Sequence, residues 1–271
     1  MRVEANGLSF EVLDEGPKDK DAVLLLHGFP DTHAMWRHQI PALTAAGYRC
    51  IAPDLRGRGA TEKPQLVEEY FAPVLLADAT GLLDALKTGR VHVVGHDWGA
   101  VVAWLLASFA PERIASLTAI SVGHPASWAW PSLEQRRRSW YMPFFHLPGA
   151  ERALRHDDWR LLREWTQNHP ETSQYIATLT PDGALTAALN WYRANAVGGW
   201  FADPVPYPPV QAPTMGIFSS GDIHLTDDQM LASREFVAGE WRYEHIDGAS
   251  HWIPLDAPDR VSELLLSHLA E

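Results

Sequence analysis

Asp97 is the residue whose type and neighbours most clearly suggest covalent chemistry. It is the centre of Gly95-His96-Asp97-Trp98-Gly99, which lies between a β-branched run, Val91–Val94, and an apolar stretch, Val101–Ala107. A Gly-x-Asp-x-Gly segment between a strand and a helix is typical of a sharp elbow that exposes a nucleophile. Its glycines let the strand and the helix approach closely. Because a carboxylate is already ionised at pH 7, Asp97 is suited to attack an electrophilic carbon, which would leave an ester on the protein.

An ester on Asp97 must be hydrolysed, which requires a base to activate water and an acid to orient that base. In chains with this elbow, the order along the sequence is nucleophile, acid, histidine. Asp222 follows the predicted strand Thr214–Phe218, and His251 lies in the loop after the predicted strand Arg242–Ile246. We expect both side chains at the edge of the sheet where Asp97 lies. Each could instead have a local role, Asp222 in a turn and His251 as a surface or capping residue.

Hydrolysis of such an ester passes through an oxyanion, which needs preorganised N–H donors. The backbone N–H of Trp98 directly follows the nucleophile and begins a predicted helix. A second donor is expected from the loop His27-Gly28-Phe29-Pro30, most simply the N–H of Phe29. His27 and His96 lie beside this site, and hydrogen bonding to neighbouring groups is their expected role.

The elements that must position these residues form an alternating pattern of strands and helices. Ala22–Leu26 and Tyr48–Ala52 are continuous apolar runs, which are typical of strands buried on both faces. Residues 2–14 indicate two strands that turn at Asn6-Gly7. Alternation of strands with helical periodicity up to residue 123 predicts a parallel sheet.

Between residues 124 and 209 the pattern changes to helical segments with many aromatic residues, including seven of the twelve tryptophans of the chain. We therefore predict a core formed by 1–123 and 210–271, with a helical cap, 124–209, at the edge where open α/β sheets bind ligands. The tryptophans predict an apolar, aromatic pocket wall. The basic run Arg136-Arg137-Arg138 is expected to be a solvated helix face.

Composition narrows the classes of partner. A length of 271 residues suffices for one large α/β domain with an insertion, and the net charge of −12 argues against nucleic acid and anionic membranes. The single cysteine, Cys50, excludes an internal disulfide and suits a reducing compartment. No N-terminal apolar segment or membrane-length apolar run occurs, so a cytoplasmic protein is expected. No Cys/His cluster indicates a metal site, and no cofactor is expected.

The chain resembles an α/β-hydrolase-fold epoxide hydrolase and is similar to the hydrolase domain of the soluble epoxide hydrolases. The motifs that carry this resemblance span nearly the whole chain: His27-Gly28-Phe29-Pro30, Pro53-Asp54-Leu55-Arg56-Gly57, Gly95-His96-Asp97-Trp98-Gly99, Asn190-Trp191-Tyr192-Arg193 and His251-Trp252. The resemblance implies an α/β-hydrolase fold, a mostly parallel eight-stranded sheet flanked by helices, with a helical cap inserted after the sixth strand.

The resemblance also implies two cap tyrosines that hydrogen-bond the epoxide oxygen and donate a proton as the ring opens. Tyr192 matches through Asn-Trp-Tyr-Arg, and Tyr141 through its position before Phe-x-x-Pro-Gly. Tyr175 is the reserve candidate for the second position. An alkoxide is too basic to depart unprotonated, and a phenol is a workable proton donor. Either tyrosine could instead be part of ordinary cap packing.

The expected function is conversion of lipophilic or aryl epoxides to vicinal diols through an ester on Asp97, with a small-molecule epoxide and water as partners and a role in detoxification. The sequence leaves open whether the protein is a monomer or a homodimer. The residues expected to contact the substrate are Phe29, Trp98, Tyr141, Tyr192 and Trp252.

Other functions remain open at this point. Haloalkane dehalogenases share the aspartate elbow but hold halide with two side-chain N–H donors; Trp98 could be one, whereas Phe29, at the usual second position, cannot donate. Fluoroacetate dehalogenases carry arginines near the nucleophile, and the predicted helix Trp98–Ala110 has none. A non-catalytic ligand receptor on a hydrolase scaffold has no need of the complete set of acid, histidine and tyrosines.

Overall fold

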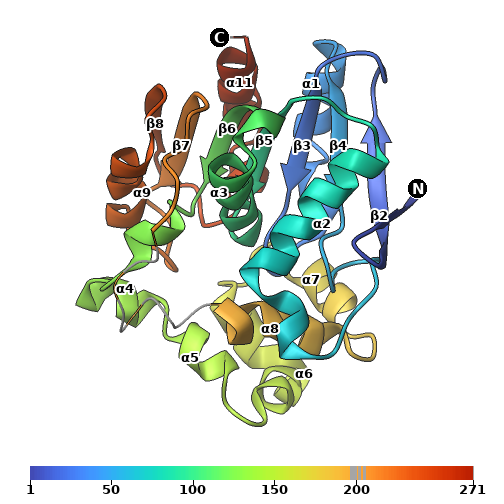
Figure 1. The fold of residues 1–271 in the computed structure, drawn as a ribbon. Helices are drawn as coiled ribbons and strands as arrows, with labels where there is room; N and C mark the ends of the chain where they lie inside the picture. The colour runs from blue at the N-terminus through green and yellow to red at the C-terminus, as the bar shows by residue number, and fades with distance from the viewer. Residues whose placement is uncertain (196–199, 201–202, 204–205, 271) are drawn as a thin grey trace.

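The computed structural model describes residues 1–195, 200, 203 and 206–270. Residues 196–199, 201–202 and 204–205 of the predicted cap, and residue 271, lie outside the described residues. Within the described part, eight strands form one sheet in the order β1-β2-β4-β3-β5-β6-β7-β8 (Figure 1). The strands are β1 (Arg2–Ala5), β2 (Leu8–Glu15), β3 (Ala22–Leu26), β4 (Arg49–Pro53), β5 (Val91–His96), β6 (Ile114–Ile120), β7 (Thr214–Ser219) and β8 (Trp241–Ile246).

The sheet is mostly parallel, as predicted. All neighbours from β4 to β8 pair in parallel, whereas β2 pairs antiparallel with both β1 and β4. The turn between β1 and β2 has positive φ at Asn6 and Gly7, 46° and 75°, which is the geometry that favours Asn-Gly in tight hairpins. The eight-stranded α/β-hydrolase architecture inferred from the motifs is therefore confirmed.

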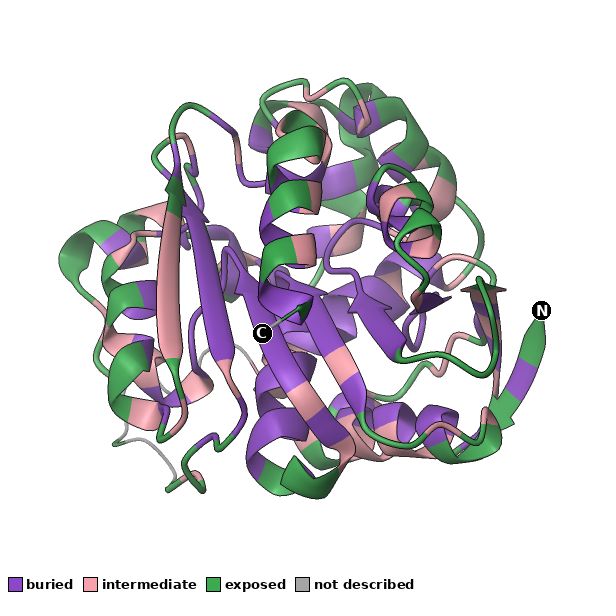
Figure 2. Ribbon diagram, turned by 90° about the horizontal axis from the view of Figure 1, so that it is seen from above, coloured by how far each residue is buried: buried purple, intermediate pink, exposed green. Residues whose placement is uncertain are grey.

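A separate hydrophobic core covers each face of the sheet. Along β3, Leu24 and Leu26 face one core, and Val23 and Leu25 face the other. This is why the run Ala22–Leu26 is apolar throughout rather than alternating. Figure 2 shows the central strands buried between helices whose outer sides are exposed.

The helices of the core divide between these two faces. α2 (Ala72–Ala85) and α3 (Trp98–Phe109) contribute to one hydrophobic core, while α1 (Gln39–Ala45) and α11 (Pro258–Leu269) contribute to the other. The remaining helical segments of the core are η1 (His33–Trp36), η2 (Val67–Tyr70), η3 (Pro111–Arg113), α9 (Asp228–Ala232), η6 (Ser233–Phe236) and α10 (Ile253–Asp256). None of the described helices is both long enough and apolar enough to cross a bilayer.

The helices that come between β6 and β7 in the chain gather at one end of the sheet (Figure 1). This arrangement confirms the prediction of a helical cap after the sixth strand. The cap elements are η4 (Pro125–Trp128), α4 (Leu133–Arg138), α5 (Tyr141–Phe145), α6 (Ala150–Trp165), α7 (Thr172–Leu179) and α8 (Ala184–Asn195). The domain limits at residues 123 and 209 stay a prediction.

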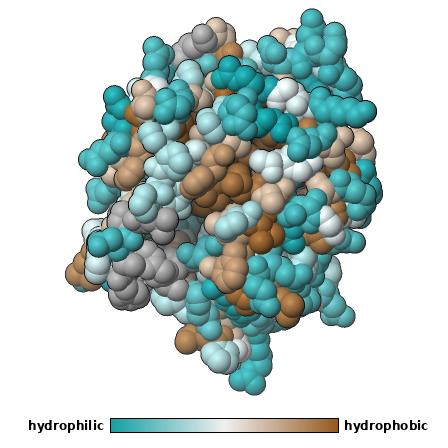
Figure 3. Space-filling model, viewed as in Figure 1, coloured by the Kyte–Doolittle hydropathy of each residue, from teal (hydrophilic) through white to brown (hydrophobic). Residues whose placement is uncertain are grey.

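On the face drawn in Figure 1, hydrophobic side chains gather near the centre among hydrophilic ones (Figure 3).

The expectation that Arg136-Arg137-Arg138 is a solvated face was wrong for Arg138. Arg137 is exposed, whereas Arg136 and Arg138 are half-buried, and Nη1 of Arg138 donates to the backbone oxygens of Asp222 and Leu225, at 2.7 and 2.6 Å. The reason is tertiary, because α4 packs against the loop that follows β7.

Candidate active site

Asp97 occupies a sharp elbow between β5 and α3, as the sequence predicted. Its backbone has φ 52° and ψ −122°, a strained conformation for a residue with a side chain. A Cβ at Gly95 would overlap the carbonyl of Gly99, and a Cβ at Gly99 would overlap the carbonyl of Leu26 at the end of β3. Only glycine at these two positions allows the strands and the helix to meet this closely.

His251 lies between the carboxylates of Asp222 and Asp97. Its Nδ1 is 2.7 Å from Oδ2 of Asp222, and its Nε2 is 3.6 Å from Oδ2 of Asp97. The three side chains follow β5, β7 and β8, whose carboxyl ends meet at one edge of the sheet. All three residues are buried. The structure therefore brings together the nucleophile, acid and histidine that the sequence singled out.

Electrostatics within this group favour the ionised forms. Burial by itself would lower the pKa of His251, but the charges and hydrogen bonds of Asp222 and Asp97 raise it to about 10. Burial would raise the pKa of Asp97 and of Asp222, yet interaction with His251 lowers both. At neutral pH His251 is thus a cation held between two anions, and Asp97 is an ionised carboxylate.

The loop after β3 touches Asp97 directly. The backbone N–H of Phe29 donates to Oδ1 of Asp97 at 2.7 Å. A Cβ at Gly28 would overlap the same carboxylate. The backbone of this loop can therefore approach Asp97 only because residue 28 is glycine. Trp98, the second expected donor of an oxyanion site, begins α3.

His27 and His96 hold the loops around the nucleophile. Nε2 of His27 accepts the N–H of Leu55 at 3.0 Å, and Nε2 of His96 donates to the backbone oxygen of His251 at 2.9 Å. Burial lowers the pKa of each imidazole to about 4, so both are neutral at pH 7. Both histidines thus form hydrogen bonds beside the site, as expected.

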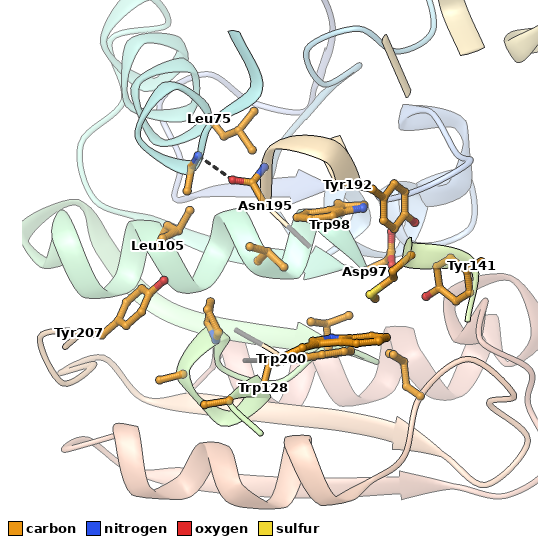
Figure 4. Close-up of a pocket in the computed structure, with 18 of the residues that line it drawn as sticks. Leu75, Asp97, Trp98, Leu105, Trp128, Tyr141, Tyr192, Asn195, Trp200 and Tyr207 are labelled. Carbon is orange, nitrogen blue, oxygen red and sulfur yellow. Dashed lines mark hydrogen bonds between the residues drawn. The ribbon is translucent and has the colours of Figure 1, made fainter. Parts of the chain in front are cut away.

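Tyr141 from α5 and Tyr192 from α8 line one cavity with Asp97, and the three side chains lie close together in Figure 4. The two tyrosine rings are nearly perpendicular, with centroids 5.9 Å apart. The reserve candidate, Tyr175, does not line this cavity, and its ring packs against Trp252 at 5.7 Å. The cavity thus places two phenols beside the carboxylate of Asp97.

This cavity measures about 350 Å³ and is mostly apolar. Side chains from α2, α3 and the cap complete its wall: Leu75, Val101, Leu105, Trp128, Met142, Trp200 and Tyr207 (Figure 4). Of the expected substrate contacts, Trp98, Tyr141 and Tyr192 line it. Phe29 and Trp252 do not: the Phe29 ring packs against Tyr192, and Trp252 packs against His251. Their contact with substrate stays a prediction.

Comparison with known proteins agrees with this geometry. The family described as alpha/beta hydrolase fold matches residues 21–258. A Bacillus subtilis protein named AB hydrolase superfamily protein YfhM is 35% identical, and Epoxide hydrolase A of Mycobacterium tuberculosis is 33% identical; each alignment covers 98% of this chain and 96% of the relative. The chain belongs to the epoxide hydrolases of the α/β-hydrolase fold family. The resemblance inferred from its motifs is confirmed.

Solved structures of epoxide hydrolases share the whole fold. One, reported among novel epoxide hydrolases in metagenomes from hot environments, is 29% identical with a TM-score of 0.90, over 99% of this chain and 97% of that one. Epoxide hydrolase A from Mycobacterium thermoresistibile is also 29% identical, with a TM-score of 0.84, over 100% of this chain and 97% of the other. The cap is therefore part of an architecture that this epoxide hydrolase shares with its relatives.

Sequence reasoning missed three polar groups around the site of this epoxide hydrolase. Oδ2 of Asp31, Nε2 of His224 and both terminal nitrogens of Arg58 are buried and have no hydrogen-bond partner among the described residues. Asp31 directly follows the loop that carries Phe29, and His224 lies two residues after Asp222, so proximity in sequence could have indicated both. Arg58 lies in a glycine-rich loop that fits no phosphate-binding motif, and nothing local distinguishes it.

Burial sets the protonation of two of these groups. Burial and the charge of Asp97 raise the pKa of Asp31 to about 8, so its carboxyl is mostly protonated at pH 7. Burial and the charge of His251 lower the pKa of His224 to about 3, so its imidazole is neutral. Within the part of the chain that the structure describes, no group of three or more His, Cys, Asp or Glu side chains is arranged to hold a metal ion.

Proposed function

We propose that this epoxide hydrolase converts lipophilic or aryl epoxides to vicinal diols through a covalent ester on Asp97. The observation that carries the proposal is the cavity that Asp97 lines together with Tyr141 and Tyr192, with Nε2 of His251 3.6 Å from the carboxylate of Asp97. One group attacks carbon, two can protonate oxygen, and one can activate water. The apolar wall supports a neutral, lipophilic substrate.

In the first half-reaction, Oδ2 of Asp97 attacks a ring carbon of the epoxide. Oδ1 accepts the N–H of Phe29 at 2.7 Å, whereas Oδ2 lies 3.6 Å from Nε2 of His251, which is why we assign the attack to Oδ2. The carbon–oxygen bond breaks, and a tyrosine O–H donates its proton to the departing oxygen. This donation matters because an unprotonated alkoxide is a poor leaving group. Tyr141 and Tyr192 supply the phenols that the step needs.

In the second half-reaction, His251 takes a proton from water, which attacks the ester carbonyl of Asp97. The bond between the carbonyl carbon and the alkyl oxygen then breaks, the departing alkoxide takes the second proton of that water, and the diol leaves.

The resting imidazole is cationic because two carboxylates face it. Esterification removes the charge of Asp97, so the pKa of His251 falls, the imidazolium releases its proton to solvent, and the neutral imidazole becomes available as a base. His251 takes up a proton again when the carboxylate of Asp97 is restored. Asp222 keeps the imidazole of His251 oriented, and the backbone N–H groups of Phe29 and Trp98 donate hydrogen bonds to the oxyanion that forms on the ester carbonyl. The order of steps thus follows from the charges of the site.

The decisive experiment is to trap the ester. His251→Gln treated with styrene oxide is expected to gain the mass of one substrate molecule on the peptide that contains Asp97, because alkylation needs no base. The double variant Asp97→Asn, His251→Gln is the matched control and should gain none. Digestion and mass spectrometry locate the adduct, and an adduct on another residue would refute the assignment of Asp97.

A parallel turnover assay separates the proposed activity from dehalogenation. The unmodified enzyme is given styrene oxide in one reaction and 1-chlorobutane in another, and diol and halide are measured. Diol without halide is expected, because Phe29 supplies no side-chain N–H to hold a halide ion. Halide release without diol would contradict the proposed function.

The cytoplasmic location expected from the sequence stays a prediction.

A further inference from the structure

Arg58 is a buried cation that the mechanism above does not use. It lies in the loop between β4 and α2 and is 4% exposed. Its guanidinium carbon is 4.8 Å from the centre of the Phe29 ring, and neither terminal nitrogen has a hydrogen-bond partner within the described residues. Burial of a cation without such a partner is energetically unfavourable, even with an aromatic ring beneath it. A buried charge of this kind requires a physical explanation.

The charge of Arg58 acts on one side of the active site. The ionisable groups whose charges act on Arg58 include Tyr192, Asp97, Tyr70 and Asp31. The Phe29 ring under the guanidinium packs edge-on against the Tyr192 ring, with centroids 5.5 Å apart. Arg58 and Tyr192 therefore flank the same phenylalanine.

The two cap tyrosines have different electrostatic surroundings. Burial and the charges of Asp97 and Asp222 raise the pKa of Tyr141. Burial, Asp97 and Tyr141 also raise the pKa of Tyr192, but Arg58 and a hydrogen bond with the Trp98 side chain act in the opposite direction. Of the two phenols, Tyr192 thus has the neighbours that favour its ionised form.

Ring opening moves a negative charge across this site. A bond forms between Oδ2 of Asp97 and the ring carbon, and the carbon–oxygen bond breaks with its electron pair on oxygen. That oxygen takes the proton of a tyrosine O–H, so the charge leaves Asp97 and appears on the tyrosine oxygen. A fixed cation on the Tyr192 side of the site stabilises this charge as it develops, because little water is present there to screen the interaction.

We propose that Arg58 is a positioning residue that stabilises the negative charge on Tyr192 during ring opening, which makes Tyr192 the proton donor and leaves Tyr141 to hold the epoxide oxygen by a hydrogen bond. This inference rests on the proposed function. Tyr192 regains a proton from solvent, which balances the proton that the imidazolium of His251 releases on esterification. The net reaction remains epoxide plus water to diol.

A double-mutant cycle tests the link between Arg58 and Tyr192. In the His251→Gln background, which isolates alkylation by styrene oxide, Arg58→Met should slow adduct formation about 10- to 100-fold. In the Tyr192→Phe background, Arg58→Met should leave the rate of adduct formation almost unchanged. In the Tyr141→Phe background, Arg58→Met should slow adduct formation by its full factor. Mass spectrometry over minutes to hours measures both fast and slow variants.

Further variants distinguish this role from a structural one. Arg58→Lys keeps the charge and should retain most of the alkylation rate. With His251 present, Arg58→Met should hydrolyse the ester at the normal rate in a single turnover and melt no lower than the unmodified enzyme, because it removes an unpaired buried cation. If Arg58→Met does not fold, Arg58→Gln removes the charge and provides the same cycle, with Arg58→Lys as the control that keeps the charge.

An equal loss in the Tyr192→Phe background, or a loss that follows Tyr141 instead, would overturn the proposal. Equal slowing of both half-reactions together with a lower melting temperature would also overturn it, since that pattern indicates a structural role. A complete absence of adduct in His251→Gln is a different result, because it would refute the proposed function itself.

Discussion

Two ionisable residues near Asp97, His251 and Asp31, both carry a proton at neutral pH, but only His251 is charged. His251 is held as a cation by two carboxylates, whereas the nearby Asp31 is mostly a neutral acid at pH 7. The difference arises because Asp31 is buried beside the negative charge of Asp97 without a cation in hydrogen-bond contact among the described residues. Because the carboxyl of Asp31 keeps its proton, it adds no further negative charge beside Asp97.

Asp31→Asn is expected to stabilise the protein at neutral pH. The raised pKa of Asp31 means that the folded state keeps a proton that the unfolded state releases above about pH 4. The corresponding stability is complete below that pH and is lost as the pH rises towards 8. Asparagine keeps the shape without the titration, so the variant should gain about 1 to 3 kcal/mol at pH 7.

Urea unfolding of both proteins at several pH values between 4 and 8 measures this effect. The gain should be small near pH 4 and grow with pH. The exposed residue Asp19 provides a matched control, because Asp19→Asn removes a carboxyl that is not buried. A gain from Asp31→Asn that did not vary with pH would contradict the explanation.

At the scale of elements, the elbow at Asp97 depends on the close approach of three elements, β3, β5 and α3. The carbonyl of Leu26 at the end of β3 occupies the space where a side chain of residue 99 would extend from α3. The same approach brings the loop after β3 close enough for Phe29 to donate to Asp97. The position of Asp97 therefore depends on contacts between β3, β5 and α3, in addition to its strained backbone.

Gly99→Ala should cost about 2 to 4 kcal/mol of stability, because the added methyl group overlaps the backbone of β3 and that backbone cannot yield easily. Gly89→Ala is the matched control. Gly89 is exposed in the loop between α2 and β5, and an added Cβ there meets no atom within 4 Å. Denaturant unfolding of the two variants should give a large and a negligible loss, and similar losses would show that close packing at the elbow is unimportant.

At the scale of the whole molecule, the cap contacts the same loops that carry the acid and the histidine. Arg138 on α4 donates to backbone oxygens on both sides of His224, and Gln135 on the same helix accepts the N–H of Thr226 at 2.8 Å. On the other side of the cap, Nε1 of Trp191 donates to the backbone oxygen of Arg56 at 3.0 Å. The cap thus covers the cavity and also braces the loop of Asp222.

Arg138→Met should therefore slow ester hydrolysis more than alkylation, by about tenfold, because loss of two hydrogen bonds loosens the loop that orients His251. Arg137→Met, at the exposed neighbouring position, should leave both rates unchanged. Single-turnover kinetics with styrene oxide separate the two steps. An equal effect on both steps would show that Arg138 supports the cap as a whole rather than this loop.

The sequence by itself determined the strands, the elbow and the order of the reactive residues. Residues in Ala22–Leu26 are apolar because both faces of β3 are covered, and this local pattern is visible without the fold. Asp222 and His251 could be singled out because a parallel sheet brings the carboxyl ends of its strands to one edge. These inferences depend on periodicity and chain order, which are properties of the sequence.

Only the tertiary structure decided which side chains share the cavity and which charges lie without partners. Trp128 and Trp200 line the cavity, whereas Trp165 packs against Phe29 and Trp191 packs against Tyr70. Arg58 and Tyr192 are far apart in the chain, and both meet the ring of Phe29. The local sequence pattern indicates whether a residue is buried, but its partners depend on how the cap packs on the sheet. That packing also determines which charged groups surround Asp97.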